Sequence, residues 1–272
     1  MRSHVLHHKQ QALSLIHIYM VAAAAFYTSV VRWGTRDASM PGMAYTLFTA
    51  AETSVSGLMI LPEDAKKTGA GPRWMGYVGV SDVDATADRI TQLGGTVQVP
   101  PTDIPGISRF SIVADPQMAT LALIKWLRPR QELPAAPNAP GRVGWHELLT
   151  ADCDKALSFY REVFGWLKGI ADVGARGTYQ LFSVGGQTAG AIVTKPATVP
   201  GAIWLYYFNV GDIDAAANRV KSGGGEILNG PTEVPDGSWI VQCIDPEGAI
   251  FALVGKRSSN AAGFLERVAA LD

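Results

Sequence analysis

The sequence of 272 residues contains one internal repeat, and this repeat limits the possible folds more than any single motif does. Residues 22–34, AAAAFYTSVVRWG, align with residues 155–169, KALSFYREVFGWLKG. Further along, residues 73–90, RWMGYVGVSDVDATADRI, align with residues 203–220, IWLYYFNVGDIDAAANRV. Because the matching segments follow one another in the same order, the chain is predicted to be a duplicated module.

The length and composition agree with two modules that each bury a core. Hydrophobic residues make up 47% of the chain, which is enough apolar surface for two small cores. A proline-rich stretch without periodicity, RPRQELPAAPNAPGR, separates the copies and predicts an extended linker. We expect a disordered tail at 1–12, a first module at 13–127, a linker at 128–142, a second module at 143–256 and a tail at 257–272.

The second copy has the clearest secondary-structure pattern. A strand is expected at 144–150, and Asp152 is a good N-cap for the helix that follows it. A later helix is expected to start near Asp212 and to stop at Gly224–Gly225. The remaining expected strands are residues 179–184, 187–194, 204–210, 239–244 and 250–254. The residues alone therefore predict the order β-α-β-β, occurring twice in each copy.

Charge and cysteine content exclude several classes of protein. The 23 basic and 24 acidic residues form no basic stripe, so a nucleic-acid partner is not expected. No uninterrupted run of about 18 apolar residues is present, so neither a membrane span nor a membrane partner is predicted. Cys153 and Cys243 form neither a disulfide framework nor a CxxC site, which fits a reducing cytoplasm.

The ordered motifs identify a family resemblance that covers most of the chain. The second copy carries TADCDKALSFYREVFGW, VGDIDAAANRV, GPTEVPDGS and DPEGAIFALV, and the first carries AAAAFYTSVVRW, VSDVDATADRI, PPTDIPGISRF and ADPQMATLALI. In this the sequence resembles the vicinal-oxygen-chelate superfamily of glyoxalases, bleomycin-resistance proteins and dioxygenases. The resemblance implies an α+β fold with two tandem glyoxalase-like modules. Each module would consist of paired βαβββ units that form a curved mixed sheet around a cleft.

The resemblance also implies where a catalytic metal would be held. Catalytic members use His and Glu side chains that project into the cleft from fixed strand positions. The corresponding positions of this sequence are Trp145, Leu205 and Ala252 in the second copy, and Ala12, Met75 and Ala122 in the first. None of these side chains is a metal ligand, so we predict no metal in either cleft.

The motif WHEL at the start of the second copy looks like a metal site but is not expected to be one. Strand alternation places Glu147 on the cleft face and His146 on the helix face. A lone carboxylate cannot hold a catalytic metal. Glu147 is the candidate catalytic and ligand-contacting residue, and a hydrogen bond that closes the end of the barrel is the structural alternative. The first copy has Ser14 at this position.

The other expected cleft residues are mainly aromatic or aliphatic, which favours binding of a flat, apolar molecule. The alternative is that these rings only fill the cleft. The predicted ligand-binding residues are Trp145, Glu147, Tyr179, Leu205, Tyr207, Asn209 and Trp239 in the second copy, and Met75, Tyr77 and Arg109, with Phe110 as the alternative to Arg109, in the first.

The remaining histidines are weaker candidates. His4, His7 and His8 could chelate a metal adventitiously, but a terminal tail is the favoured interpretation. His17 occupies a helix-facing position, so a core role is favoured over a ligand role.

Three functional hypotheses follow. The favoured hypothesis is a glyoxalase-like protein that binds a small apolar or aromatic molecule without a metal, as a monomer or homodimer. The alternative is a lyase, isomerase or dioxygenase that uses Zn, Ni, Fe or Mn, or uses Glu147 as a general base. The third hypothesis is an interaction module with collapsed clefts and an exposed apolar patch.

Overall fold

The computed structural model describes residues 10–67, 69–128, 138–174 and 177–258. Two eight-stranded mixed sheets form the body of the protein, one from each copy of the repeat. The first sheet has the order β2-β3-β4-β1-β5-β8-β7-β6. Its strands are β1 (Gln10–His17), β2 (Gly34–Asp37), β3 (Tyr45–Ala50), β4 (Thr53–Ile60), β5 (Arg73–Gly79), β6 (Thr96–Ile104), β7 (Ser108–Ala114) and β8 (Thr120–Trp126).

The second sheet repeats this topology in the order β10-β11-β12-β9-β13-β16-β15-β14. Its strands are β9 (Val143–Thr150), β10 (Leu167–Gly174), β11 (Gly177–Val184), β12 (Gln187–Thr194), β13 (Ile203–Asp212), β14 (Glu226–Glu233), β15 (Trp239–Ile244) and β16 (Ile250–Lys256). In each sheet the two central strands are antiparallel, and each of them also pairs in parallel with the last strand of its own unit. These are the paired βαβββ units that the resemblance implied.

The order β-α-β-β inferred from the residues alone was one strand short in each unit. The strands missed in the second copy are β10, in which every residue is exposed, and β14, in which most residues are exposed. Both lie at the edges of the sheet, where no alternation of apolar residues is needed.

Five helices are present in the described part of the chain: α1 (Met20–Val31), α2 (Glu63–Lys67), α3 (Val83–Gln92), α4 (Cys153–Phe164) and α5 (Ile213–Ser222). The predicted caps of the second copy are confirmed, because Asp152 accepts a hydrogen bond from the Lys155 amide and Asp212 from the Ala215 amide. Helix α5 ends at Gly223, and Gly224 then adopts a positive φ of 85°.

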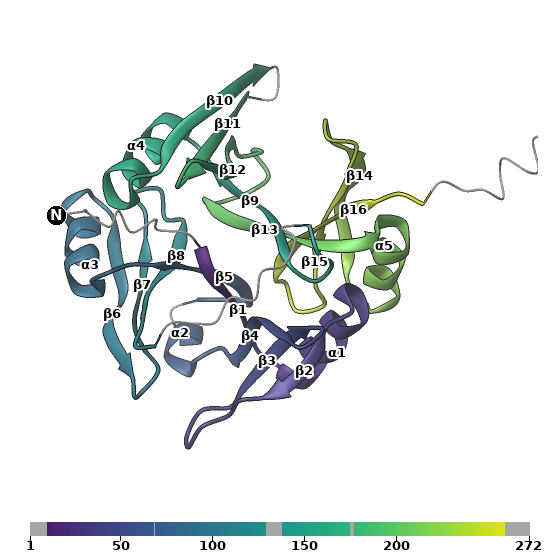
Figure 1. Cartoon of the computed structure of the whole chain (residues 1–272), viewed down its shortest axis with the longest axis horizontal. Helices are drawn as coiled ribbons and strands as arrows, with labels where there is room; N and C mark the ends of the chain where they lie inside the picture. Colours follow the sequence, from purple (N-terminus) through teal and green to yellow (C-terminus); the bar gives the residue numbers. More distant parts are fainter. Residues whose placement is uncertain (1–9, 68, 129–137, 175–176, 259–272) are drawn as a thin grey trace, which may run out of the picture.

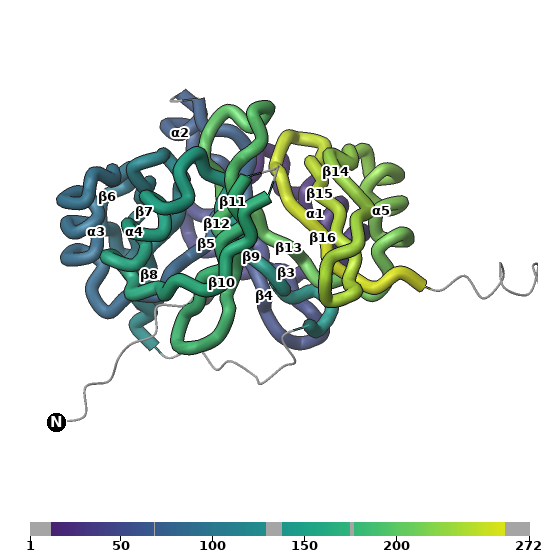
Figure 2. Tube along the Cα trace, turned by 90° about the horizontal axis from the view of Figure 1, so that it is seen from above, coloured from purple at the N-terminus to yellow at the C-terminus, as the bar shows by residue number. Residues whose placement is uncertain are grey.

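The two sheets contact each other through their central strands, with β13 against β5 and β8 and with β16 against β5, and the copies lie side by side in Figure 1. At the centre, Trp74 of β5 lies with its ring 4.7 Å from that of Phe208 on β13. Helix α1 contacts α5 at one side of the molecule and α3 contacts α4 at the other (Figure 2). A single hydrophobic core therefore contains residues of both modules.

Matching polar groups tie the modules together inside this core. Tyr27 of the first module donates a 3.0 Å hydrogen bond to Asp245 of the second. In the mirrored contact, Tyr160 of the second module donates a 3.0 Å bond to Asp115 of the first. The repeat is therefore also a structural pseudo-symmetry.

His17 is a buried core residue, as the sequence predicted. Its Nε2 lies 3.0 Å from Asp245, and its Nδ1 lies 2.8 Å from Glu247 at an angle too poor for a hydrogen bond. Burial raises the pKa of Asp245, but hydrogen bonds from His17 and from the Ala249 amide outweigh it and leave the pKa lowered.

The first module begins earlier than expected. Strand β1 starts at Gln10, so residues 10–12 pair within the sheet although the tail was expected to extend to residue 12. The predicted tail histidines His4, His7 and His8, most of the linker and the end of the C-terminal tail lie outside the described residues. No helix in the described chain is long and apolar enough to cross a membrane.

Candidate functional site

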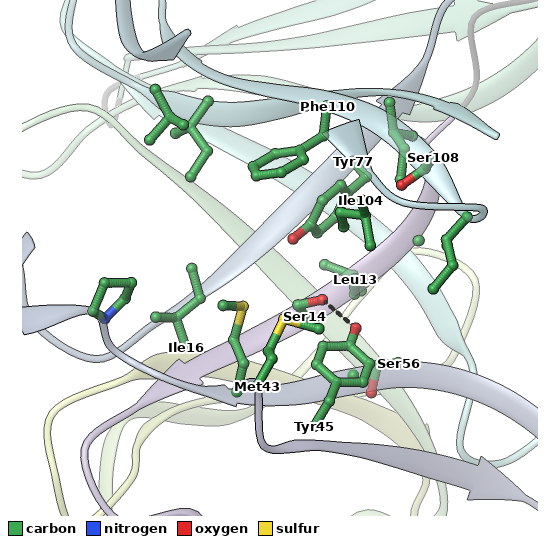
Figure 3. A pocket seen from close by; sticks show the side chains of 18 of the residues that line it. Leu13, Ser14, Ile16, Met43, Tyr45, Ser56, Tyr77, Ile104, Ser108 and Phe110 are labelled. Carbon is green, nitrogen blue, oxygen red and sulfur yellow. Dashed lines mark hydrogen bonds between the residues drawn. The ribbon is translucent and has the colours of Figure 1, made fainter. Parts of the chain in front are cut away.

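A cavity of about 1260 Å³ lies in the cleft of the first module. Strands β1, β3, β4, β5, β6, β7 and β8 and the region around α2 contribute to its walls. Figure 3 shows Ile16 on the left of the cavity and Ser108 at the upper right, with Ser14, Tyr45 and Tyr77 between them. The volume is sufficient for a molecule of drug size.

The wall of this cavity is mainly apolar. Met40, Met43 and Met59 line it together with Phe110 and Ile112. Methionine side chains are flexible and polarizable, so they adapt to ligands of different outline. The wall is therefore suited to a flat, apolar ligand.

A small polar group interrupts the apolar wall. The Ser14 hydroxyl lies 3.2 Å from the Tyr45 hydroxyl (Figure 3). Burial raises the pKa of Tyr77 to about 12, so its phenol stays neutral near pH 7. Two further hydroxyls, those of Ser56 and Ser108, are buried and have no hydrogen-bond partner among the described residues. These groups could fix the orientation of a bound molecule.

The second cleft contains a directed chain of hydrogen bonds that ends at Glu147. Trp145 donates to the Tyr179 hydroxyl at 3.1 Å, and Tyr179 donates to Glu147 Oε1 at 2.9 Å. From the other side, Gln242 donates to the Tyr207 hydroxyl at 3.0 Å, and Tyr207 donates to Glu147 Oε2 at 2.6 Å. Both carboxyl oxygens of Glu147 are therefore occupied by neutral donors.

The electrostatic surroundings of Glu147 favour its protonated form. Burial raises the pKa of this carboxyl, and the hydrogen bonds from Tyr207, Tyr179 and Trp145 lower it by less. Burial and the nearby carboxylate also raise the pKa values of Tyr207 and Tyr179. A carboxyl with a raised pKa can exchange a proton closer to neutral pH.

The two clefts are built on equivalent positions with different side chains. In the first sheet Ser14 pairs with Gly57 and Met75, and in the second Glu147 pairs with Ala191 and Leu205. By the same register Tyr45 corresponds to Tyr179 and Tyr77 to Tyr207. The arrangement Tyr45–Ser14–Tyr77 is thus the counterpart of Tyr179–Glu147–Tyr207.

Gly57 helps to shape the first cavity. A Cβ atom at this position would lie 1.8 Å from the Tyr45 hydroxyl, so the ring of Tyr45 can lie across the strand only because residue 57 has no side chain.

Most of the predicted ligand-binding residues lie near one of the two clefts. Trp145, Tyr179 and Tyr207 surround Glu147, and Leu205 is buried against Tyr207 at the base of the second cleft. In the first module Tyr77 lines the cavity, whereas Met75 is packed among Ile16, Leu61 and Ala122 below it.

Two predicted residues, Trp239 and Arg109, do not face the clefts. Trp239 packs against the main core, and the Arg257 guanidinium lies 3.8 Å from the centre of its ring. Arg109 is bound by Asp84 at 2.7 and 2.8 Å and by Asp103 at 2.9 Å. Phe110, the predicted alternative to Arg109, lines the first cavity, and Ile240 packs beside Tyr207 where Trp239 had been expected. Alternation shifted by one residue exchanges the two faces of a strand.

Asn209, on β13, contacts the end of the linker. Its side-chain amide donates to the Ala139 carbonyl at 3.3 Å. His146 confirms the predicted alternation, because it is half-buried with its ring 6.0 Å from that of the core residue Tyr206, and its Nδ1 lies 2.9 Å from the Ala189 carbonyl.

Sequence reasoning missed several residues of the first cavity. Tyr45 and Met43 come from a segment of the first copy in which no motif was recognised, and Ser108 lies within the motif PPTDIPGISRF but was not singled out. Aligning Tyr45 with Tyr179 would have been the available signal, but the loops between the two helices and these strands differ in length.

The comparisons with known proteins agree with this architecture. The family model described as Glyoxalase/Bleomycin resistance protein/Dioxygenase superfamily matches residues 12–123 and again residues 142–253. The chain belongs to this superfamily. The two matches coincide with the two sheets of the structure, so each glyoxalase module corresponds to one sheet.

Two groups of relatives resemble the chain over most of its length. CFP32 of Mycobacterium bovis, a protein with a provisional glyoxylase name, is 33% identical over 235 residues, which cover 86% of this chain and 89% of that protein. The anthracycline biosynthesis protein DauV of Streptomyces sp. strain C5 is 30% identical over 255 residues, covering 88% and 90%.

Solved structures share the fold at lower identity. The Mn(II)-bound glyoxalase from Novosphingobium aromaticivorans has a TM-score of 0.59 at 17% identity and covers 92% of this chain and 83% of that one. The 2,3-dioxygenase LapB from Pseudomonas sp. KL28 has a TM-score of 0.61 at 12% identity, covering 93% and 94%. These likenesses concern the fold alone.

The superfamily implies a divalent metal, but the residues in these glyoxalase modules do not fit one. Within the described ranges, no group of three or more His, Cys, Asp or Glu side chains is close enough to hold a metal. Glu147 lies beside Leu205, and its two oxygens already accept hydrogen bonds from tyrosines. A single carboxylate is not a sufficient ligand set for a divalent ion.

Proposed function

We propose that this glyoxalase-like protein binds a flat, apolar small molecule in the cavity of its first module and does so without a metal. The observation that carries the proposal is the cavity of about 1260 Å³ with its mainly apolar wall. The polar groups at Ser14, Tyr45 and Tyr77 support it, because a few fixed polar groups in an apolar pocket are typical of small-molecule sites.

The test uses a neutral aromatic probe, N-phenyl-1-naphthylamine, whose fluorescence increases in apolar surroundings. We expect saturable binding of one probe per full-length chain. Met59→Trp places a large ring into the cavity and should weaken binding at least about tenfold, since it removes the volume and contact area that the probe needs. Titration of fluorescence at a fixed protein concentration measures this change.

The structure offers a matched control in the other module. Val193 occupies the position in the second sheet that corresponds to Met59 in the first. Val193→Trp should leave probe affinity within about twofold, and circular dichroism checks that both variants are folded. Loss of binding in Val193→Trp with full binding in Met59→Trp would place the site in the second cleft and contradict the proposal.

The hydrogen-bonded carboxyl of the second cleft favours a second candidate function, which is proton transfer. Glu147 has a raised pKa and is linked through Tyr179, whose side chain is 36% exposed, to the cleft surface. Glu147 could take a proton from one carbon of a bound hemithioacetal and return it to the neighbouring carbon.

This candidate predicts slow isomerisation of a hemithioacetal by the wild-type protein. Glu147→Gln keeps an oxygen acceptor for a tyrosine hydroxyl but cannot carry the proton, so turnover should fall at least about 100-fold. Formation of the thioester product, followed by its ultraviolet absorbance, measures the rate. Equal rates for wild type and Glu147→Gln would exclude Glu147 as the base.

A further inference from the structure

Among the described residues, Arg73 is the one arginine with a buried guanidinium nitrogen that has no hydrogen-bond partner. Arg73, the first residue of β5, lines the cavity next to Ile16 on β1. Its Nε is buried without a hydrogen-bond partner among the residues described, and Arg73 takes part in none of the ion pairs found in the described chain. By contrast, Arg109 and Arg257 are each held by carboxylates at 2.6–2.9 Å.

The surroundings of Arg73 do not neutralise its charge. Burial lowers the pKa of this guanidinium, and no carboxylate of the described residues acts in the opposite direction. The acidic residue of the cavity wall, Asp64, is bound to Lys67 at 2.9 Å and its side chain is 95% exposed. Because an arginine remains protonated in proteins, Arg73 brings an uncompensated positive charge to the cavity.

This charge is specific to the first cleft. Arg73 pairs with Ile16, and in the equivalent register of the second sheet Ile203 pairs with Leu149. The second module therefore has an aliphatic residue where the first has a guanidinium. A planar guanidinium is well matched to a carboxylate, with which it forms two parallel hydrogen bonds.

We infer that the ligand of the first cavity is an apolar or aromatic acid whose anionic group is bound by Arg73. This inference rests on the proposed function and narrows its ligand class. The apolar part of the molecule lies along the methionine and aromatic wall, and the buried hydroxyl of Ser108 at the far end from Ile16 remains available to a second polar group (Figure 3).

The experiment compares two competitors of nearly the same shape, 2-naphthoate and 2-naphthalenemethanol, which differ in charge. Each displaces N-phenyl-1-naphthylamine from the full-length protein. We expect wild type to bind naphthoate at least about tenfold more tightly than the alcohol, because a charge-assisted hydrogen-bond pair is lost with the alcohol. In Arg73→Met this preference should disappear, and the ratio of the two competitors' affinities is measured within that one variant.

Two further variants make the assignment specific. Arg73→Lys keeps the charge and should retain part of the preference for naphthoate. Arg128, the other arginine of the cavity wall, is exposed to solvent, so Arg128→Met should keep the preference. A preference lost in Arg128→Met and kept in Arg73→Met would overturn the assignment to Arg73.

The outcomes separate this inference from the proposed function. If the neutral probe does not bind wild type, or binds Met59→Trp unchanged, the proposed function fails. If the probe binds in the first cavity but wild type does not prefer naphthoate, only the inference fails. The wild-type comparison needs no variant, so the inference stays testable even if Arg73→Met does not fold.

Discussion

A single pair of corresponding residues accounts for much of the difference between the two clefts. Ser14 leaves its surroundings open in the first module, whereas Glu147 fills the same place in the second and accepts hydrogen bonds from two tyrosine hydroxyls. The shorter side chain provides volume for a ligand, and the longer one provides an acid.

Glu147 should make the stability of the protein depend on pH. Its pKa is raised in the folded state, mainly by burial, so the native protein holds this proton more tightly than the unfolded chain does. The stability that the protonated carboxyl contributes is fully present below the unfolded pKa of about 4.3 and is lost as the pH rises through the folded pKa. Glu147→Gln removes this dependence. Relative to the variant, wild type should therefore lose unfolding free energy as the pH increases.

Urea denaturation of both proteins between pH 4 and pH 8 measures this difference. The exposed Glu52 serves as the control, because Glu52→Gln should give a curve parallel to that of wild type. A constant difference between wild type and Glu147→Gln across the pH range would show that the carboxyl titrates normally.

Residue-level interpretation of the sequence succeeded where alternation along one strand was sufficient. The opposite placement of His146 and Glu147 followed from the period of strand β9 alone. The faces of Trp239 and Arg109 could not be obtained this way, because the phase of one strand relative to another depends on loop lengths and pairing register.

At the scale of elements, the sequence was most informative where local chemistry determines structure. The turn at Gly185–Gly186 joins β11 and β12 at the predicted place, and Asp152 and Asp212 cap the helices as expected. The exposed edge strand β10 was missed because solvent covers its surface and no apolar period is required. The family resemblance, which implies βαβββ units, supplied the missing strand.

The first cavity shows a different limit of sequence interpretation. Its volume depends on side chains from seven strands that do not fill the space between them. Tyr45 lies across Gly57, so it forms part of the wall and leaves the interior open. Whether a ring fills a cleft or lines it depends on such close approaches, which the sequence does not encode in any local pattern.

At the scale of the whole molecule, the two modules depend on each other for their core. Phe26 of α1 lies with its ring 5.9 Å from that of Phe251, and Trp33 lies 5.0 Å from Phe208. Tyr27 and Tyr160 donate to aspartates across the same boundary. Each module alone would expose aromatic rings to water and leave buried polar groups without partners.

We therefore expect that neither half of the chain folds independently. Residues 1–137 and 138–272, produced separately, should aggregate or lack the cooperative thermal transition of the full chain. Produced together, they should recover it, because the contacts between modules do not require the linker. Circular dichroism and size-exclusion chromatography distinguish these states. A sharp unfolding transition of either half alone would contradict a shared core.

The isolated first half should also fail to bind the probe. Although the cavity is lined only by the first module, residues 1–137 alone should not bind N-phenyl-1-naphthylamine saturably. Strand β5, which carries Arg73 and Tyr77, packs against β13 and β16 of the second sheet.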